Sequence, residues 1–171
     1  GAEAALIATA PLEAFSRRAR LASINVRPDP DGKIRRFSVT GRLPGIERPT
    51  MAAALAGPGQ HADGVFSIDY GIQIGTIPRV SYVDVLRGAV SPSALAGKKV
   101  IVGATAVELG DQLAVPVLRA LPGALIEALA FESMVQGRAL TRVSPVAVLL
   151  VALALALLLG PKFVVWSVRR G

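Results

Sequence analysis

One uninterrupted apolar run constrains this chain most. Val143–Leu159 holds 17 residues without a charge, and only Ser144 and Pro145 among them are not hydrophobic. A helix of that length rises about 25 Å, slightly less than the ~30 Å hydrocarbon core of a bilayer. From Val146 onward there is no polar face of the kind that a surface helix requires. The run therefore predicts a transmembrane helix, with a fully buried core helix as the alternative.

The residues that follow the run predict a membrane–water boundary. Gly160-Pro161 breaks or kinks a helix, and Trp166 with the arginines that close the chain is typical of an interface. Either the helix ends at this Gly-Pro pair, or a kinked helix continues to Val168. We therefore predict two parts, an extramembrane domain at 1–142 and a transmembrane segment at 143–168 with an interfacial or kinked end.

Composition narrows the classes of function. The formal net charge is +7, but the basic residues are scattered, and aromatic side chains that could stack on bases are few. We therefore expect no nucleic-acid partner and interpret the charge as a solvated basic face or as attraction to anionic lipid head groups. The absence of cysteine excludes disulfides, thiolate zinc sites and cysteine nucleophiles. Because neither an initiator Met nor a signal peptide is visible, we interpret the sequence as part of a longer protein.

Local signals ahead of the apolar run predict a mixture of strands and short helices. Prolines and capping residues open the helices and glycines close them, whereas the strands show apolar alternation. Asp31-Gly32 predicts a hairpin turn between two strands, and we prefer this turn to a calcium loop because the late glutamate ligand is missing. We expect helices at 11–20, 49–56, 81–86 and 123–136, a helical turn from Ser91-Pro92 to Gly97, and strands at 21–26, 33–40 and 65–70.

The run Lys98–Ala106 predicts a strand of a different kind. Three consecutive β-branched apolar residues, Val100-Ile101-Val102, are typical of a strand buried on both faces and therefore parallel to its neighbours. Ligands of open parallel sheets sit beyond the carboxyl ends of the strands. The candidate ligand-binding residues are therefore Gly103, Thr105, Gly110 and Asp111. A plain strand-to-loop turn is the alternative, because the glycine spacing matches neither the dinucleotide-binding motif nor the phosphate-binding loop.

We find no constellation of catalytic residues. His61 is the single histidine, and no nucleophile stands near it in a recognisable context. Glu127 and Glu132 are five residues apart on the expected last helix, about 140° around its axis, so they do not form an acid–base pair. We therefore expect no catalytic residue, no metal site, no cofactor and no enzymatic activity for the residues shown.

Five stretches belong together by their order along the chain. They are INVRPDPDGKIRRF (24–37), IDYG (68–71), VSYVDVLRG (80–88), LAGKKVIVGATAVELGD (95–111) and PGALIEALAFESMVQGRAL (122–140), and the apolar run follows them. This ordered set resembles the distal part of a CHASE2 domain, the extracytoplasmic sensory module of bacterial signalling proteins.

The resemblance, taken with the local signals, implies an α/β fold with a partly parallel sheet flanked by helices in three layers, followed by a C-terminal transmembrane helix. It implies a sensory input domain that passes a ligand-dependent change through this helix to a cytoplasmic cyclase, histidine kinase, or diguanylate cyclase or phosphodiesterase. It also implies the bacterial inner membrane as the location, with residues 1–142 periplasmic. The implied partners are a small-molecule ligand, membrane lipid and a second copy of the receptor. A scaffold ectodomain and a membrane-anchored hydrolase are the alternatives.

Overall fold

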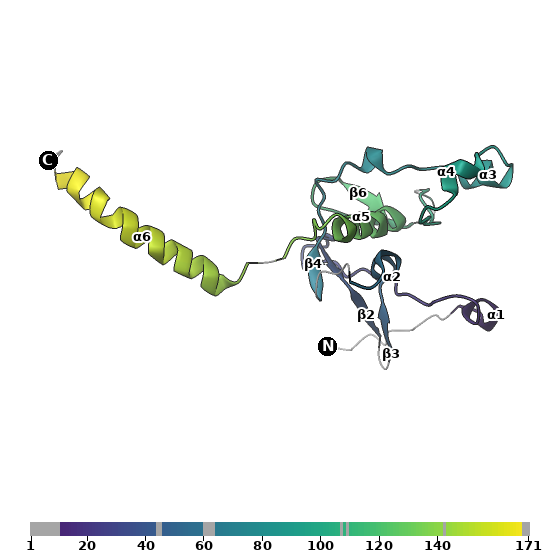
Figure 1. Ribbon diagram of the computed structural model, residues 1–171, viewed down its shortest axis with the longest axis horizontal. Coiled ribbons are helices and arrows are strands. Elements are labelled where there is room, and N and C mark those ends of the chain that lie inside the picture. The colour runs from purple at the N-terminus through teal and green to yellow at the C-terminus, as the bar shows by residue number, and fades with distance from the viewer. Residues whose placement is uncertain are drawn as a thin grey trace. The chain divides into compact units, whose positions relative to one another are not determined.

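The chain divides into two compact units, Gly1–Leu140 and Thr141–Gly171, and each is described here by itself. Figure 1 shows a computed structural model, which describes residues 11–43, 46–59, 64–106, 108, 110–141 and 143–168. The side chains of residues 42, 43, 46 and 160–168 lie outside the description.

The first unit consists of short elements in a mixed order, ending in its longest helix. In chain order they are α1 (Glu13–Ser16), β1 (Arg36–Ser38), β2 (Thr40–Leu43), β3 (Ile46–Pro49), α2 (Met51–Ala56), β4 (Val65–Ser67), the 3-10 turn η1 (Ile74–Thr76), α3 (Tyr82–Leu86), α4 (Pro92–Leu95), β5 (Gln112–Ala114), β6 (Ala120–Pro122) and α5 (Gly123–Val135).

The described strands form three two-stranded antiparallel sheets. β1 pairs with β4, β2 with β3, and β5 with β6. The α/β class is therefore confirmed, but the partly parallel sheet is not found among the described strands. Parallel pairing there is limited to an isolated bridge between Ser23 and Thr50.

The prediction of a buried strand at Lys98–Ala106 is wrong for this structure. These residues form neither strand nor helix, and Val100 and Val102 are 50% and 75% exposed. A β-branched run forms a strand only when neighbouring strands supply hydrogen bonds and cover its faces. None of the described strands lies alongside it, so the pattern alone does not produce the strand.

The predicted hairpin between 21–26 and 33–40 is half right. The turn forms, because the backbone N–H of Gly32 donates to the carbonyl of Asp29 at 2.8 Å and Gly32 takes a left-handed φ of 80°. Residues 21–26, however, contribute only the bridge at Ser23, and β1 pairs with β4 instead.

The predicted helices are found close to their expected places. α2 begins after Thr50 and ends at Gly57, where φ is 84°, and α5 is followed by Gly137 with φ of 64°. Both glycines supply the left-handed conformation that ends a helix without a Cβ clash. α1 is shorter than the predicted 11–20, with its single turn ending at Ser16.

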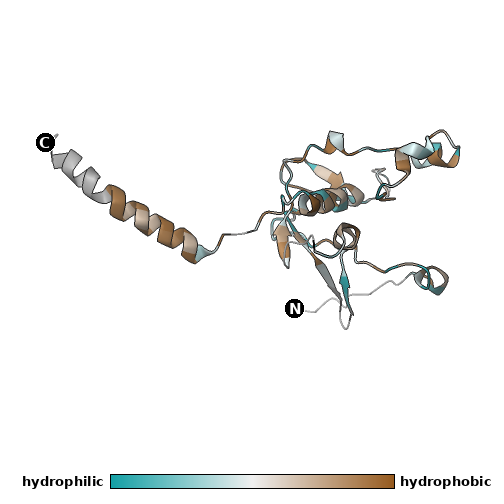
Figure 2. Ribbon diagram, viewed as in Figure 1, coloured by the Kyte–Doolittle hydropathy of each residue, from teal (hydrophilic) through white to brown (hydrophobic). Residues whose placement is uncertain are grey.

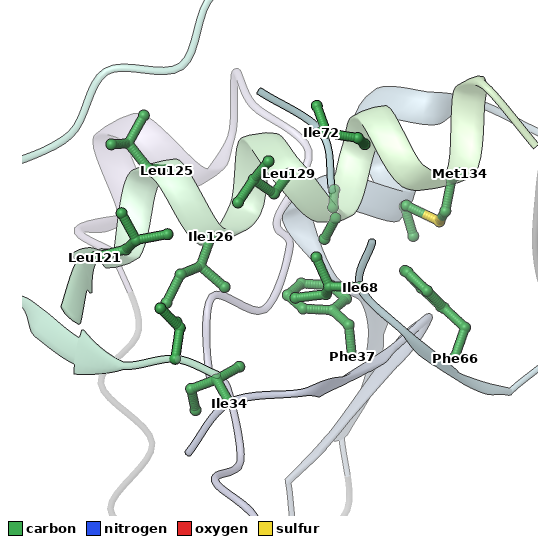
Figure 3. Packing of buried hydrophobic residues seen from close by; sticks show 14 of the residues in the cluster. Ile34, Phe37, Phe66, Ile68, Ile72, Leu121, Leu125, Ile126, Leu129 and Met134 are labelled. Carbon is green, nitrogen blue, oxygen red and sulfur yellow. The ribbon is translucent and has the colours of Figure 1, made fainter. Parts of the chain in front are cut away.

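The core of the first unit is built around α5. Ile126, Leu129 and Ala130 are fully buried in the middle of this helix, and the alanines of α2 pack against it. Figure 3 shows the same face meeting Phe37 of β1 and Phe66 of β4, whose ring centroids lie 5.9 Å apart. α5 therefore links the β1–β4 sheet, the β5–β6 sheet and α2 within one apolar cluster.

The second unit contains α6 (Pro145–Val168), whose described side chains are apolar from Val146 onward (Figure 2). Among the residues that the structure describes, no helix has both the length and the apolarity needed to span a bilayer. The prediction of a transmembrane helix at 143–168 is therefore not supported.

Candidate functional site

The four residues predicted as ligand contacts lie on the segment that leads to β5 and α5. Of these four residues, Asp111 makes the most clearly defined contact. Its Oδ2 accepts a hydrogen bond at 3.1 Å from the N–H of Gly123, the first residue of α5. A negative group is favoured there because the first turn of a helix has free N–H donors and a positive dipole end. Asp111 therefore has a structural role in fixing the start of α5.

Gly103 also has a packing role at the start of α5. A Cβ atom at this position would lie 2.4 Å from the Cβ of Ala124, so only glycine allows the coil to pass so close to the helix. Thr105 and Gly110 lie in the exposed part of the loop, and Gly110 has a left-handed φ of 70°. The structure thus brings Gly103 and Asp111 together at α5. A ligand-binding role for the four residues stays a prediction.

The turn at Asp29 and Asp31 is held by arginines. Arg35 bridges both carboxylates, at 3.3 Å to Asp29 and 2.6 Å to Asp31, and Arg36 pairs with Asp29 at 2.5 Å. Hydrogen bonds from Arg36 to Asp29 and from Arg35 to Asp31 hold the pKa of both carboxyls below the usual range. These contacts support turn chemistry over a calcium loop.

Within the described part of the chain, no cluster of His, Asp or Glu is suited to a metal ion. His61 lies outside the described residues.

A contact that sequence reasoning missed lies where the chain leaves the first unit. We call it the exit latch and define it as Ser67, Asp69, Arg138 and Leu140. Arg138 places its Nη2 at 2.6 Å and its Nε at 2.7 Å from Oδ2 of Asp69. Leu140 and Ser67 exchange two backbone hydrogen bonds, at 2.8 and 3.1 Å. The segment after α5 is therefore tied to β4 and to the residues that follow it.

The exit latch is supported from inside the core. The backbone N–H of Asp69 donates to the hydroxyl of Ser133 at 3.1 Å, and that hydroxyl donates to the carbonyl of Leu129 at 2.7 Å. The Oδ1 of Asp69 accepts from the N–H of Gly71 at 2.7 Å. Asp69 thus contacts the body of α5 through its backbone and the exit segment through its side chain. The only signal in the sequence was an aspartate after one apolar strand and an arginine just after a helix-ending glycine.

The second missed residue is Glu127 on α5. Its side chain is buried, with 3% of the residue exposed, and its Oε2 accepts a hydrogen bond from the backbone N–H of Ala52 at 3.0 Å. Its Oε1 has no hydrogen-bond partner within the described structure. Burial raises the pKa of this carboxyl to about 7, and the Ala52 hydrogen bond offsets only part of that rise. An acidic residue inside an apolar helical stretch was the available signal.

Glu127 supplies the hydrogen-bond acceptor that the first turn of α2 does not receive from Thr50, the residue before this helix. Thr50 stands at the start of α2, yet its hydroxyl donates to the carbonyls of Ser38 and Val39 instead of accepting from the helix. The N–H of Ala52 in the first turn is satisfied by the Glu127 carboxyl instead. The contact therefore holds α2 to α5 at one point through a polar bond in an apolar surrounding.

The fold and these contacts define a small α/β domain whose central helix leads into a fixed exit segment. The chain belongs to the CHASE2 domain family, which matches residues 3–161. CHASE2 domains are a family of sensory domains of signalling proteins. The resemblance drawn from the five ordered stretches is thereby confirmed, apart from its transmembrane helix. No curated protein and no solved structure matches the chain.

Proposed function

We propose that this chain is the sensory input part of a membrane-bound bacterial receptor. In this proposal the first unit responds to a small molecule, and the change passes through residues 137–141 and α6 to a cytoplasmic output domain. Membership of a sensory family supports the input role. The observation that carries the relay is the exit latch, because it joins the segment leaving the domain to the sheet and the central helix.

The size of the latch suits a relay. Coupling between a ligand and a distant output is typically about 1–3 kcal/mol. The partly exposed Arg138–Asp69 pair contributes at most about 1 kcal/mol. Each of the two backbone hydrogen bonds adds about 0.5–1.5 kcal/mol net, so the latch as a whole contributes about 1–4 kcal/mol, comparable to that coupling. A ligand that displaces β4 or α5 slightly is therefore able to switch the exit segment between a bound and a released arrangement.

A membrane surrounding for α6 is the second part of the proposal. Its described side chains are apolar and exposed, with Val146, Leu149 and Leu157 between 63% and 69% exposed. Such a surface is costly in water and favourable in lipid. We propose the inner membrane as the location, with the first unit in the periplasm. The family's implication supports this, as does a slight excess of basic residues beyond the apolar run, where Lys162, Arg169 and Arg170 follow it and Arg138 and Arg142 precede it.

Thiol labelling tests this location, because the chain has no cysteine of its own. In intact cells, a membrane-impermeant maleimide is expected to label Ser93→Cys, on the exposed α4, after outer-membrane permeabilisation alone. Leu153→Cys on α6 is the matched control and is expected to stay unlabelled until detergent is added. Labelling of Ser93→Cys only after lysis of the inner membrane contradicts the proposed location.

The relay is tested with the whole chain fused at Gly171 to a reporter output domain. Asp69→Arg and Arg138→Asp each place like charges in the latch and are expected to shift the basal output. The double variant restores an opposite-charge pair and is expected to recover most of the original output. Glu13→Arg, which breaks the fully exposed Glu13–Arg17 pair, serves as control. Unchanged output in both single variants contradicts the relay.

The ligand contacts are proposed at the loop that contains Thr105 and Gly110. Both residues are exposed, and they follow a coil that packs on α5 at Gly103, so a molecule bound to them is able to act on the central helix. Calorimetric titration of the full chain with small metabolites is the test. A ligand that binds this loop is expected to lose affinity with Thr105→Ala and to keep it with Thr76→Ala in η1. Equal losses, or none, place the ligand elsewhere.

A further inference from the structure

Glu127 is the one buried carboxyl whose surroundings leave it incomplete within the described structure. Its Oε1 is fully enclosed and has no hydrogen-bond donor, while Oε2 holds the N–H of Ala52. Ile126 and Leu129 on the same helix belong to the buried apolar cluster that also contains the alanines of α2. An ionised carboxylate enclosed by apolar side chains is strongly destabilised unless a counterion or enough hydrogen-bond donors pair with it.

We propose that Glu127 is a proton-binding switch in the core, at which the gain or loss of one proton changes how tightly α2 is held against α5. With the proton bound, the carboxyl is neutral and the apolar contact between the helices is undisturbed. Without it, a bare charge stands in the core, and openings that bring water to the carboxylate are favoured. The ligand of this site is therefore the proton itself, and no cavity is needed to admit it.

No charged group described around α5 neutralises Glu127. α2, β5 and β6 carry no ionisable side chain. Lys99 donates to a carbonyl at the far end of α2 and lies over the Phe131 ring, Asp111 is bound to the first turn of α5, and Arg36 of β1 is paired with Asp29. Burial and the Ala52 hydrogen bond are accordingly the two influences on the pKa of Glu127.

The position of the switch connects it to the exit. Two turns further along α5, Ser133 accepts a hydrogen bond from the backbone of Asp69, which holds Arg138 in the exit latch. Loosening of α5 against α2 is therefore expected to reach the exit segment through the same helix. This signalling consequence rests on the proposed receptor role, whereas proton binding by Glu127 does not.

The first test is a carboxyl-carbon NMR titration of the full chain in mild detergent, with glutamate labelled. The Glu127 resonance, assigned by its loss in Glu127→Gln, is expected to titrate with a midpoint near 7. Glu132, half-buried on the same helix with its carboxylate accepting a hydrogen bond from Gln136, is the internal control. A Glu127 midpoint near the ordinary value of 4.5 overturns the proposal. The wild-type titration remains decisive even if Glu127→Gln folds poorly, since Glu127→Asp also identifies the resonance.

The second test is amide hydrogen exchange at pH 5.5 and pH 8, corrected for the intrinsic pH dependence of exchange. The Ala52 amide and its neighbours in α2 are expected to open about tenfold more often at the higher pH. Glu127→Gln is expected to abolish this difference, and Glu132→Gln to retain it. An unchanged difference in Glu127→Gln overturns the switch. If both tests succeed while a fused reporter ignores pH, proton binding by Glu127 stands and its coupling to the exit segment fails.

Discussion

α5 and α6 are both apolar helices, yet they meet opposite surroundings. Eight residues of α5 are buried, whereas every described side chain of α6 is exposed. α5 carries polar groups at Glu127 and Ser133, and each of these bonds to another element. Residues 146–159 of α6 have no polar side chain at all. Both helices are apolar enough to need burial away from water. The few polar residues of a helix indicate whether other protein segments bury it, because those residues need hydrogen-bond partners.

The small residues of α5 explain why protein covers it. Ala130 is buried in the same apolar cluster as Ala52 and Ala53 of α2, and the two helices pack closely against each other. Close approach maximises dispersion contacts and leaves no room for a water-filled gap. In α6, alanine alternates with leucine only over residues 152–157, and all the described side chains from Val146 are those of valine, leucine or alanine, a surface suited to the lipid contact proposed for it. The two helices therefore differ in the shape of their surfaces as well as in polarity.

The largest expected effect on the unfolding free energy comes from comparing one leucine substitution in each helix. Leu129→Ala removes a fully buried side chain from α5 and is expected to lower the unfolding free energy of the first unit by about 3–4 kcal/mol. Leu153→Ala on α6, where the leucine is 56% exposed, is expected to change it by less than about 0.5 kcal/mol. Urea unfolding monitored by far-UV circular dichroism measures the unfolding free energy of both variants. Equal losses in the two variants would show that the units are not independent.

The sequence predicted local structure well and long-range pairing poorly. Capping residues and glycines located the helices, and Asp31-Gly32 located a turn, because those signals act within a few residues. The partner of β1 was missed, since β4 is contributed by residues 65–67 far along the chain. The run at Val100-Ile101-Val102 indicated a strand, but strand formation depends on neighbours that no local pattern encodes.

The candidate site shows the same limit. Glu127 and Ala52 are 75 residues apart, and Arg138 and Asp69 are 69 apart. The five-residue spacing placed Glu127 and Glu132 on different faces of the helix, but it carried no information that Glu127 is buried against α2. Gly103 and Asp111 were singled out for a ligand, and the fold gives both a role in packing the start of α5. A sequence identifies residue types suited to chemistry; the pairing that uses them emerges only from the fold.

The second prediction concerns the charge that distinguishes α5 from α6. Because the pKa of Glu127 is raised from 4.5 to about 7 in the folded chain, the folded state binds this proton more tightly than the unfolded state. Stability is therefore full below pH 4.5 and falls as the pH rises to 7, by up to about 3 kcal/mol. Unfolding free energies of the wild type and Glu127→Gln across this window are the measurement. The difference between them is expected to change with pH, and a constant difference contradicts the argument.

The third prediction tests how closely the coil packs on α5. Gly103→Ala forces a Cβ against Ala124 and is expected to cost about 1–3 kcal/mol of unfolding free energy, because both contacting atoms belong to short, inflexible side chains. Gly75→Ala meets no atom within 4 Å and is the matched control, expected to cost nothing. Thermal unfolding compares the two. A harmless Gly103→Ala would mean that the coil moves freely away from the helix.

The smallest expected effect concerns the exit from α5. The Arg138–Asp69 pair is partly exposed, with side-chain exposures of 45% and 19%, so Arg138→Ala is expected to lower the unfolding free energy by only about 1 kcal/mol. Its local consequence is larger than its global one, because the pair lies next to the two backbone hydrogen bonds that tie Leu140 to Ser67 at the end of the first unit. We therefore expect the Leu140 amide to lose exchange protection while amides of α5 around Leu129 keep theirs. Arg17→Ala removes an ion pair whose two side chains are 74% and 76% exposed, and it is expected to change neither quantity. Uniform loss of protection in Arg138→Ala would indicate that the pair stabilises the whole domain, in which case the exit segment has no separate motion for a signal to use.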